Sequence, residues 1–205
     1  LRDGKGMLKV PLGALEIAKL PVARMVRNQF GAVRVEGGPG FVTYDVKFSP
    51  EMSLDRPPTE ADLTVPEAER PAIREVAGKL GLASKPPREV VRGVKAFFEN
   101  HFLYSLVLKG ADGTVTPLRD FLTKTRKGHC EYFASATVLL LRALGLPARY
   151  ATGFSVHEFS RWENRFVVRA RHGHAWVLVW MDGAWHDLDT TPPSWIAQEN
   201  KAASF

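Results

Sequence analysis

The chain contains very little cysteine and lacks long apolar runs. A single cysteine among 205 residues excludes an internal disulfide, so the thiol is either an inert buried group or one kept for its reactivity. Apolar runs stay short of the ~18 residues that a membrane-spanning helix needs. The longest, residues 138–146, is interrupted by Arg142. Because the chain begins at Leu1 without a methionine, a charged n-region or an apolar h-region, we expect a domain cut from a longer protein.

Signatures of nucleic-acid binding are missing as well. The sequence has neither basic runs interleaved with aromatic residues nor zinc-finger spacing, and it shows no repeats or low-complexity tract. Its net charge of +6 and pI of about 9.6 indicate a solvated basic surface, with an anionic lipid or cell-wall surface as the alternative. The 45% of hydrophobic residues is enough for a sizeable core in a soluble globular protein.

The first 60 residues form a β-rich segment in our prediction. Residues 32–36 and 41–48 alternate apolar and polar side chains, and the glycine-rich stretch 37–40 between them predicts a hairpin. Residues 53–63, which include two prolines, are interpreted as a linker. We therefore predict a catalytic core over residues 61–205.

Helices are expected to come first in this core. Val65–Pro66 should open one that Gly81 ends, a second should start near Pro87, and Thr116–Pro117 should begin a short third. A fourth, from Cys130 to Leu144, is apolar nearly all round and is therefore predicted to be a buried central helix. Strands are then expected at 148–154, 165–171, 175–181 and 185–188, which is an α+β order with an antiparallel sheet.

Cys130 follows a glycine turn and stands where the central helix begins. Backbone amides and the dipole at a helix N-terminus favour the thiolate, and the amide of the attacking residue can also donate to a developing oxyanion. The alternative is a small buried side chain, since unpaired cysteine is among the most buried residue types.

A histidine and a carboxylate are predicted to meet on the last hairpin. Asp182–Gly183 between two apolar runs indicates a two-residue turn, which places residues whose numbers sum to 365 opposite each other. His174 and Asp189 are then diagonal neighbours on one sheet face, within reach of a hydrogen bond that would orient the imidazole. A register slip of one residue would separate them.

Three other assignments compete with this one. Asp187 shares the face of Asp189 but lies deeper along the hairpin, and Glu131 is expected to point toward substrate or solvent. His172, His174 and His186 could suggest zinc, but His186 has the wrong parity and lies at a distance. No metal or cofactor is therefore predicted.

Four separated motifs follow one another in a recognisable order: Gly128–Ala134, Leu144–Phe154, His174–Val177, and Trp185 with Asp189. With them, about residues 62–193 resemble the transglutaminase-like superfamily, most closely bacterial versions carried on membrane-anchored proteins. This chain departs from the family pattern at Leu178, where family members often have an acidic residue, and at Thr190–Pro192, where many have proline directly after the aspartate. Residues 1–60 match no family pattern.

The resemblance implies a papain-like fold in which Cys130 is the nucleophile, His174 the general base and acid, and Asp189 the orienting carboxylate. Tyr104 and Trp176 become candidates for oxyanion donor and substrate wall. The implied reaction transfers the acyl group of a glutamine side chain to a primary amine, or to water, which gives deamidation. The expected partners are therefore a protein or peptide glutamine donor and a lysine-like amine. The expected location is outside the cytoplasm.

Two other functions remain open. The same three residues would serve a cysteine peptidase or amidase acting on peptide or cell-wall peptide, because both reactions pass through a covalent acyl intermediate on the thiol. A non-catalytic binding module would keep the fold without the chemistry.

Overall fold

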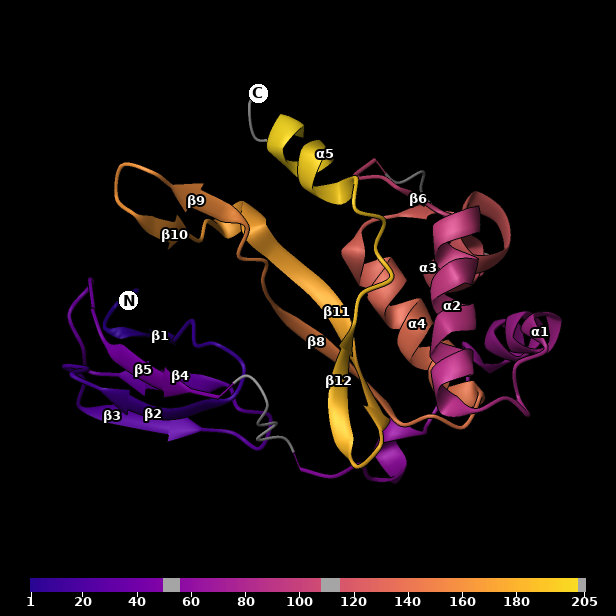
Figure 1. The fold of residues 1–205 in the computed structure, drawn as a ribbon, viewed down its shortest axis with the longest axis horizontal. Helices are drawn as coiled ribbons and strands as arrows, with labels where there is room; N and C mark the ends of the chain where they lie inside the picture. The colour runs from indigo at the N-terminus through magenta and orange to yellow at the C-terminus, as the bar shows by residue number, and fades with distance from the viewer. Residues whose placement is uncertain (50–55, 108–114, 203–205) are drawn as a thin grey trace. The chain divides into compact units, whose positions relative to one another are not determined.

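The computed structural model describes residues 1–49, 56–107 and 115–202 (Figure 1). Its backbone packing divides the chain into two compact units, residues 1–57 and 58–205. None of the helices in the described ranges has the length and apolarity that crossing a bilayer requires.

The first unit consists of short antiparallel strands around a small apolar cluster formed by Leu8, Val33 and Val35. One sheet has the order β1-β4-β3 and the other pairs β2 with β5. The strands are β1 (Lys5–Met7), β2 (Ala14–Ala18), β3 (Arg24–Arg27), β4 (Val33–Glu36) and β5 (Asp45–Phe48).

The hairpin predicted across residues 37–40 is wrong. β4 pairs with β1 and β3, and β5 pairs with β2, so the two alternating segments lie in different sheets. Gly37 does have a positive φ of 71°, but Ala23 of a third segment packs where its side chain would be. Tertiary packing thus decides the partners of these strands.

The second unit contains the helices and the larger sheet. Pro87, Thr116 and Gly81 mark helix ends as predicted, and the hydroxyl of Thr116 accepts a hydrogen bond from the amide of Arg119. The first helix begins at Arg70 rather than at Val65, because residues 66–69 form a turn. The helices are α1 (Arg70–Leu80), α2 (Pro87–His101), α3 (Pro117–Asp120), α4 (Cys130–Ala143) and α5 (Trp195–Ala202).

The main sheet has the antiparallel order β12-β11-β8, and α4 lies between it and helices α1 and α2 (Figure 1). This is the predicted α+β arrangement. The strand expected at residues 165–171 is shorter, because β10 ends at Val167 and a 3₁₀ turn follows. The strands are β8 (Ala148–Phe154), β9 (Glu158–Ser160), β10 (Arg165–Val167), β11 (Gly173–Met181) and β12 (Ala184–Leu188).

Part of the predicted linker is structured. Residues 53–55 lie outside the described residues, but Asp62 is 6% exposed in a 3₁₀ turn. Its carboxylate accepts two hydrogen bonds from Arg149, at 2.9 and 3.0 Å. This bidentate pair fastens the start of the second unit to β8, so the segment belongs to the core.

Candidate functional site

Cys130 is the first residue of α4. The short strand β7 (Lys127–Gly128) pairs in parallel with β6 (Leu103–Tyr104) and delivers the chain to the helix. Gly128 is required there, since a Cβ would lie 2.9 Å from Tyr132 and 3.1 Å from the ring of Phe121. The thiol is half-buried, and its backbone amide belongs to the first turn, whose N–H groups have no intrahelical acceptor.

His174 and Asp189 meet as the hairpin arithmetic predicts. β11 and β12 pair in the register Val177↔Leu188 to Met181↔Ala184, and each of these pairs sums to 365. Beyond the ladder, Nε2 of His174 lies 2.7 Å from Oδ2 of Asp189. The other carboxylate oxygen accepts a 2.9 Å hydrogen bond from the amide of Thr191. The carboxylate is therefore held from two sides, and it holds the ring in one orientation.

The thiol lies close to the ring of this histidine, since Cys130 and His174 each shift the pKa of the other. Nδ1 of His174 is buried, and no hydrogen-bond partner with ordinary geometry is found for it within the described ranges. Because Nε2 is engaged by the carboxylate, Nδ1 is the nitrogen left available to the thiol. This is the order that a nucleophile, a base and an orienting group need.

The electrostatics of this pair favour charge separation. Burial acts to raise the pKa of Cys130, but hydrogen bonding with His129, His174 and the amide of Ala175 outweighs it and lowers that pKa to about 6. Burial likewise opposes protonation of His174, yet Asp189 and Cys130 raise its pKa to about 9. At neutral pH the resting pair is therefore thiolate and imidazolium.

Two of these contributors were not predicted from the sequence. His129 precedes the thiol, and its own pKa is raised by hydrogen bonding with Cys130. Its place beside the thiol is a signal that could have been read. The amide of Ala175 gives no such signal, because backbone groups become visible only when β11 is placed against α4.

The neighbouring carboxylate, Asp187, has a different partner. It accepts a 2.7 Å hydrogen bond from Nε1 of Trp176. The indole lies across Gly153 of β8, where a Cβ would come within 2.7 Å of the ring. Trp176 is thus fixed beside His174, with the two rings 12° from parallel and their centroids 6.4 Å apart.

Tyr104 is buried close to Cys130, and its hydroxyl is already engaged. It donates a 2.5 Å hydrogen bond to Oε1 of Glu199 on α5. Burial, this carboxylate and the nearby thiolate all raise the pKa of the phenol, so it stays neutral. The single hydroxyl proton is therefore donated to Glu199.

Trp195, the first residue of α5, covers the face of His174. The two rings are stacked with centroids 4.3 Å apart and planes 8° from parallel, and Trp195 is 5% exposed. Pro193 and Ser194 just before it are an ordinary helix-start signal, but periodicity alone cannot tell which buried group the indole covers.

The other candidates are not brought to this site. His186 donates to the backbone carbonyl of Met181 near the hairpin turn, and His172 lies in the 3₁₀ turn before β11. Within the described ranges, no three histidine, cysteine, aspartate or glutamate side chains are grouped to hold a metal ion. Glu131 is exposed.

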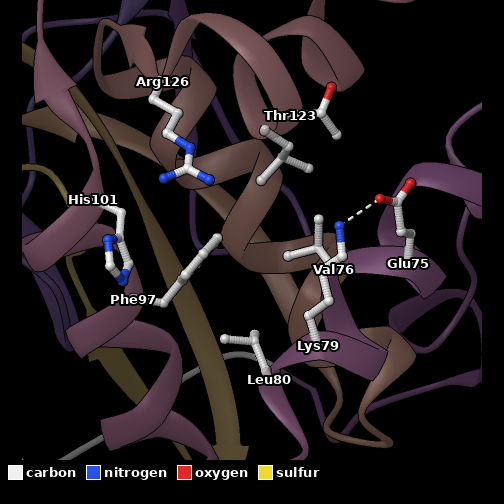
Figure 2. Close-up of a pocket in the computed structure, with 9 residues that line it drawn as sticks. Glu75, Val76, Lys79, Leu80, Phe97, His101, Thr123 and Arg126 are labelled. Atoms are coloured by element: carbon white, nitrogen blue, oxygen red, sulfur yellow. Dashed lines mark hydrogen bonds and ion pairs between the residues drawn. The ribbon is translucent and has the colours of Figure 1, made fainter.

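A separate pocket of about 300 Å³ lies in the second unit (Figure 2). Arg126 and His101 lie on one side of it, and the Lys79–Glu75 ion pair of 2.6 Å lies on the other. It contains none of Cys130, His174 and Asp189, so the nucleophile is elsewhere. Its lining residues are Glu75, Val76, Lys79, Leu80, Phe97, His101, Leu122, Thr123 and Arg126.

Known proteins resemble this chain over much of its length. The family model described as the transglutaminase-like superfamily core matches residues 74–190, more than half of the chain. The chain belongs to the transglutaminase-like superfamily. The matched segment contains Cys130, His174 and Asp189, and it ends before Trp195.

Individual relatives are bacterial. The chain is 34% identical over 146 residues to a protein-glutamine gamma-glutamyltransferase of Pseudomonas aeruginosa, covering 69% of this chain and 21% of that protein. It is 34% identical over 76 residues to the uncharacterized protein YebA of Bacillus subtilis, covering 35% and 10%. The chain thus spans about a fifth or less of the length of these curated relatives.

Solved structures show the same similarity. The periplasmic domain of TgpA from Pseudomonas aeruginosa bound to ethylmercury matches with a TM-score of 0.70 and 25% identity, over 96% of this chain and 73% of that one. A second structure of that domain matches with a TM-score of 0.57 and 28% identity, over 82% and 56%. A putative cysteine protease from Cytophaga hutchinsonii, at 19% identity and a TM-score of 0.50, shares the fold.

Proposed function

We propose that the chain is a thiol acyltransferase of the transglutaminase type, with Cys130, His174 and Asp189 as its catalytic residues. The observation that carries this proposal is the thiol at the start of α4 beside an imidazole whose far nitrogen is held 2.7 Å from a carboxylate. The naming of the Pseudomonas aeruginosa relative as a protein-glutamine gamma-glutamyltransferase supports the choice of reaction.

In the first half-reaction, the Cys130 thiolate attacks the carbonyl carbon of a glutamine side-chain amide and a carbon–sulfur bond forms. The amide oxygen becomes an oxyanion, which the backbone amide of Cys130 at the helix N-terminus is placed to stabilise. When the intermediate collapses, the carbon–nitrogen bond breaks and the His174 imidazolium gives its proton to the leaving nitrogen. Ammonia departs and a thioester remains.

In the second half-reaction, a primary amine attacks the thioester and neutral His174 takes a proton from its nitrogen. The carbon–sulfur bond then breaks, which restores the thiolate and the imidazolium and leaves an isopeptide bond. Water in place of the amine yields glutamate. Asp189 keeps Nδ1 of the ring aimed at the thiol throughout and stabilises its charged form.

Trp176 is proposed as a wall of the acyl-donor site, since its indole is fixed beside His174 by Asp187 and Gly153. Tyr104 is less suited to donate to the oxyanion, because its proton is held by Glu199. We also propose residues 61–205 as the catalytic core, with residues 1–60 as an accessory β-rich segment.

A location outside the cytoplasm, in a protein that is anchored to a membrane by other segments, is proposed from the likeness to the periplasmic domain of TgpA. The expected partners are a protein or peptide glutamine and a lysine-like amine.

The test is incorporation of a biotin-labelled primary amine into a glutamine-rich acceptor protein. The wild-type chain should label the acceptor, and Cys130→Ala should abolish labelling while it keeps the melting temperature. Because Cys130 is the only cysteine, one equivalent of iodoacetamide at neutral pH should block both the thiol and the labelling. A thiol that reacts only after denaturation contradicts the proposal.

The related activity on a peptide bond uses the same three residues. Mass spectrometry of a glutamine peptide incubated with and without the amine separates the outcomes. A mass increase by the amine less ammonia indicates transfer, conversion to glutamate indicates deamidation, and two fragments indicate a peptidase. No product together with an unreactive thiol indicates a binding module.

A further inference from the structure

We propose that Trp195 is a positioning residue for the imidazole of His174, and that its indole face holds the ring in the charged, correctly oriented form. This inference rests on the proposed function, because it assigns His174 the role of acid and base. Trp195 lies beyond the segment that the family model matches, so the family pattern does not supply it.

The contact has the geometry of a stack and not of incidental packing. The indole and the imidazole are 8° from parallel with centroids 4.3 Å apart, and both side chains are buried. A flat surface on one face limits rotation about the bond between Cβ and the ring, and so adds to the restraint that the hydrogen bond to Asp189 provides. The electron-rich face of an indole also attracts an imidazolium more than a neutral imidazole.

Helix α5, which carries Trp195, is tied to both sides of the site. Glu199 accepts the hydrogen bond of Tyr104 from the side of Cys130. Asn200 accepts one of 3.3 Å from Arg171, which lies three residues before His174. The amide of Trp195 itself donates to the carbonyl of Pro192 at 3.1 Å. The indole is therefore held by a helix that both halves of the site anchor.

Several titratable groups lie around the stacked pair. Asp189 contacts Nε2 of His174, and Cys130 is close enough to the ring to raise its pKa. The ring of His157 also contacts the indole, in a T-shaped arrangement with ring centroids 6.0 Å apart. The ring centroids of His157 and His172 are 4.5 Å apart. Glu158 in turn lies 3.4 Å from His172. The experiment on Trp195 therefore includes a control for the neighbouring His157 ring.

The experiment compares Trp195→Phe, which keeps an aromatic face, with Trp195→Leu, which keeps apolar cover without one. Two quantities are measured: the pH midpoint for iodoacetamide alkylation of Cys130, and kcat/KM for amine incorporation. All variants are also made with His157→Gln, so that this ring does not contribute to the midpoint. Trp185→Leu is the matched control, because Trp185 is a buried tryptophan that packs on Arg149 away from the site.

For Trp195→Leu we expect the alkylation midpoint to rise by about half a unit to one unit, because the imidazolium that stabilises the thiolate is itself less stable. We expect kcat/KM to fall by about 3- to 30-fold. Trp195→Phe should stay within about threefold of the wild type. Trp185→Leu should lower the melting temperature without moving the midpoint.

The proposal is overturned if Trp195→Leu is folded and keeps the wild-type midpoint and kcat/KM, or if the phenylalanine variant is as impaired as the leucine variant. If the leucine variant does not fold, Trp195→Met provides the same comparison with a more adaptable side chain. Alkylation needs no substrate, so these midpoints can be measured even if amine incorporation fails and the proposed function with it.

Discussion

The two hairpins of the second unit are close in sequence and are stabilised in opposite ways. In β11–β12, Ala175, Val177 and Val179 are buried, and β11 packs against α4. In β9–β10, Phe159 and Phe166 contact each other with ring centroids 5.2 Å apart, yet they remain 48% and 59% exposed. The candidate site thus lies where one face of a hairpin is fixed by the core, since this core holds the register that aligns His174 with Asp189.

Asp189 and Asp187 provide the strongest test of the packed hairpin, because they lie on one face with different partners. We expect Asp189→Asn to lower kcat for amine incorporation by about 10²- to 10⁴-fold, since an amide favours the wrong imidazole tautomer and does not stabilise imidazolium. Asp187→Asn, which keeps an acceptor for Trp176, should stay within about threefold.

Thermal denaturation of both variants is the control, since neither substitution changes side-chain volume appreciably. Equal losses of activity in the two would mean that the hairpin face is needed as a whole and would remove the distinction between the carboxylates.

The pH dependence of Cys130 tests its ion pair with His174 of the packed hairpin. Its pKa of about 6 and that of His174 of about 9 define a window in which the thiolate and the imidazolium coexist. Alkylation of the thiol should therefore rise as pH increases through about 6. Amine incorporation should fall again above about 9, where the proton for the leaving nitrogen is lost.

At the base of β9–β10, Arg169 and Arg171 hold the pKa of the half-buried Glu158 below its usual range, so the Glu158 carboxylate stays charged throughout that window. An alkylation midpoint of Cys130 near ~8.5, the ordinary thiol pKa, would contradict the ion pair between Cys130 and His174.

Much of the β11–β12 hairpin could be predicted from sequence, because its geometry depends on residues that are near one another in the chain. Asp182–Gly183 is a tight turn that fixes the register, and alternating apolar residues fix the face, so His174 and Asp189 are aligned before any tertiary information is used. The start of α4 at Cys130 is equally local. The partners of β4 and β5 depend on packing between distant segments, and a glycine-rich stretch signals only that the chain turns.

The surroundings of the site were less predictable for the same reason. Trp195 covers His174 from a separate helix, and Glu199 captures the Tyr104 hydroxyl from 95 residues away in sequence. Asp62 falls within the predicted linker, because the prolines of this segment indicate a loop and nothing in it indicates that one carboxylate pairs with Arg149. No periodic pattern in the sequence predicts these contacts, because they form only when distant elements pack together.

A buried hydrogen bond between Thr137 of α4 and Thr190 should contribute to the rigidity of the packed hairpin. The two hydroxyl oxygens are 2.7 Å apart, and both residues are almost fully buried. We expect Thr137→Val to lower the free energy of unfolding by about 1–3 kcal/mol, because it leaves the Thr190 hydroxyl buried without its partner. Urea denaturation measures this.

The double variant Thr137→Val/Thr190→Val should recover part of the loss, since it removes both polar groups. If the double variant loses the sum of the two single losses, the hydroxyls act independently and the pair does not tie the segment after β12 to α4.

The smallest effect is expected at the tip of β9–β10, where Trp162 is 100% exposed. Trp162→Ala should change the free energy of unfolding by no more than about 0.5 kcal/mol, since the exposed side chain does not contribute to the core. Trp185→Ala on β12, where the indole is 7% exposed and packs 4.0 Å from the guanidinium of Arg149, should cost about 3–5 kcal/mol. Urea denaturation of the two variants compares the stability lost when a tryptophan is removed from each hairpin. Similar losses would mean that Trp162 is covered in solution, and β9–β10 would then have to be counted with the packed part of the unit.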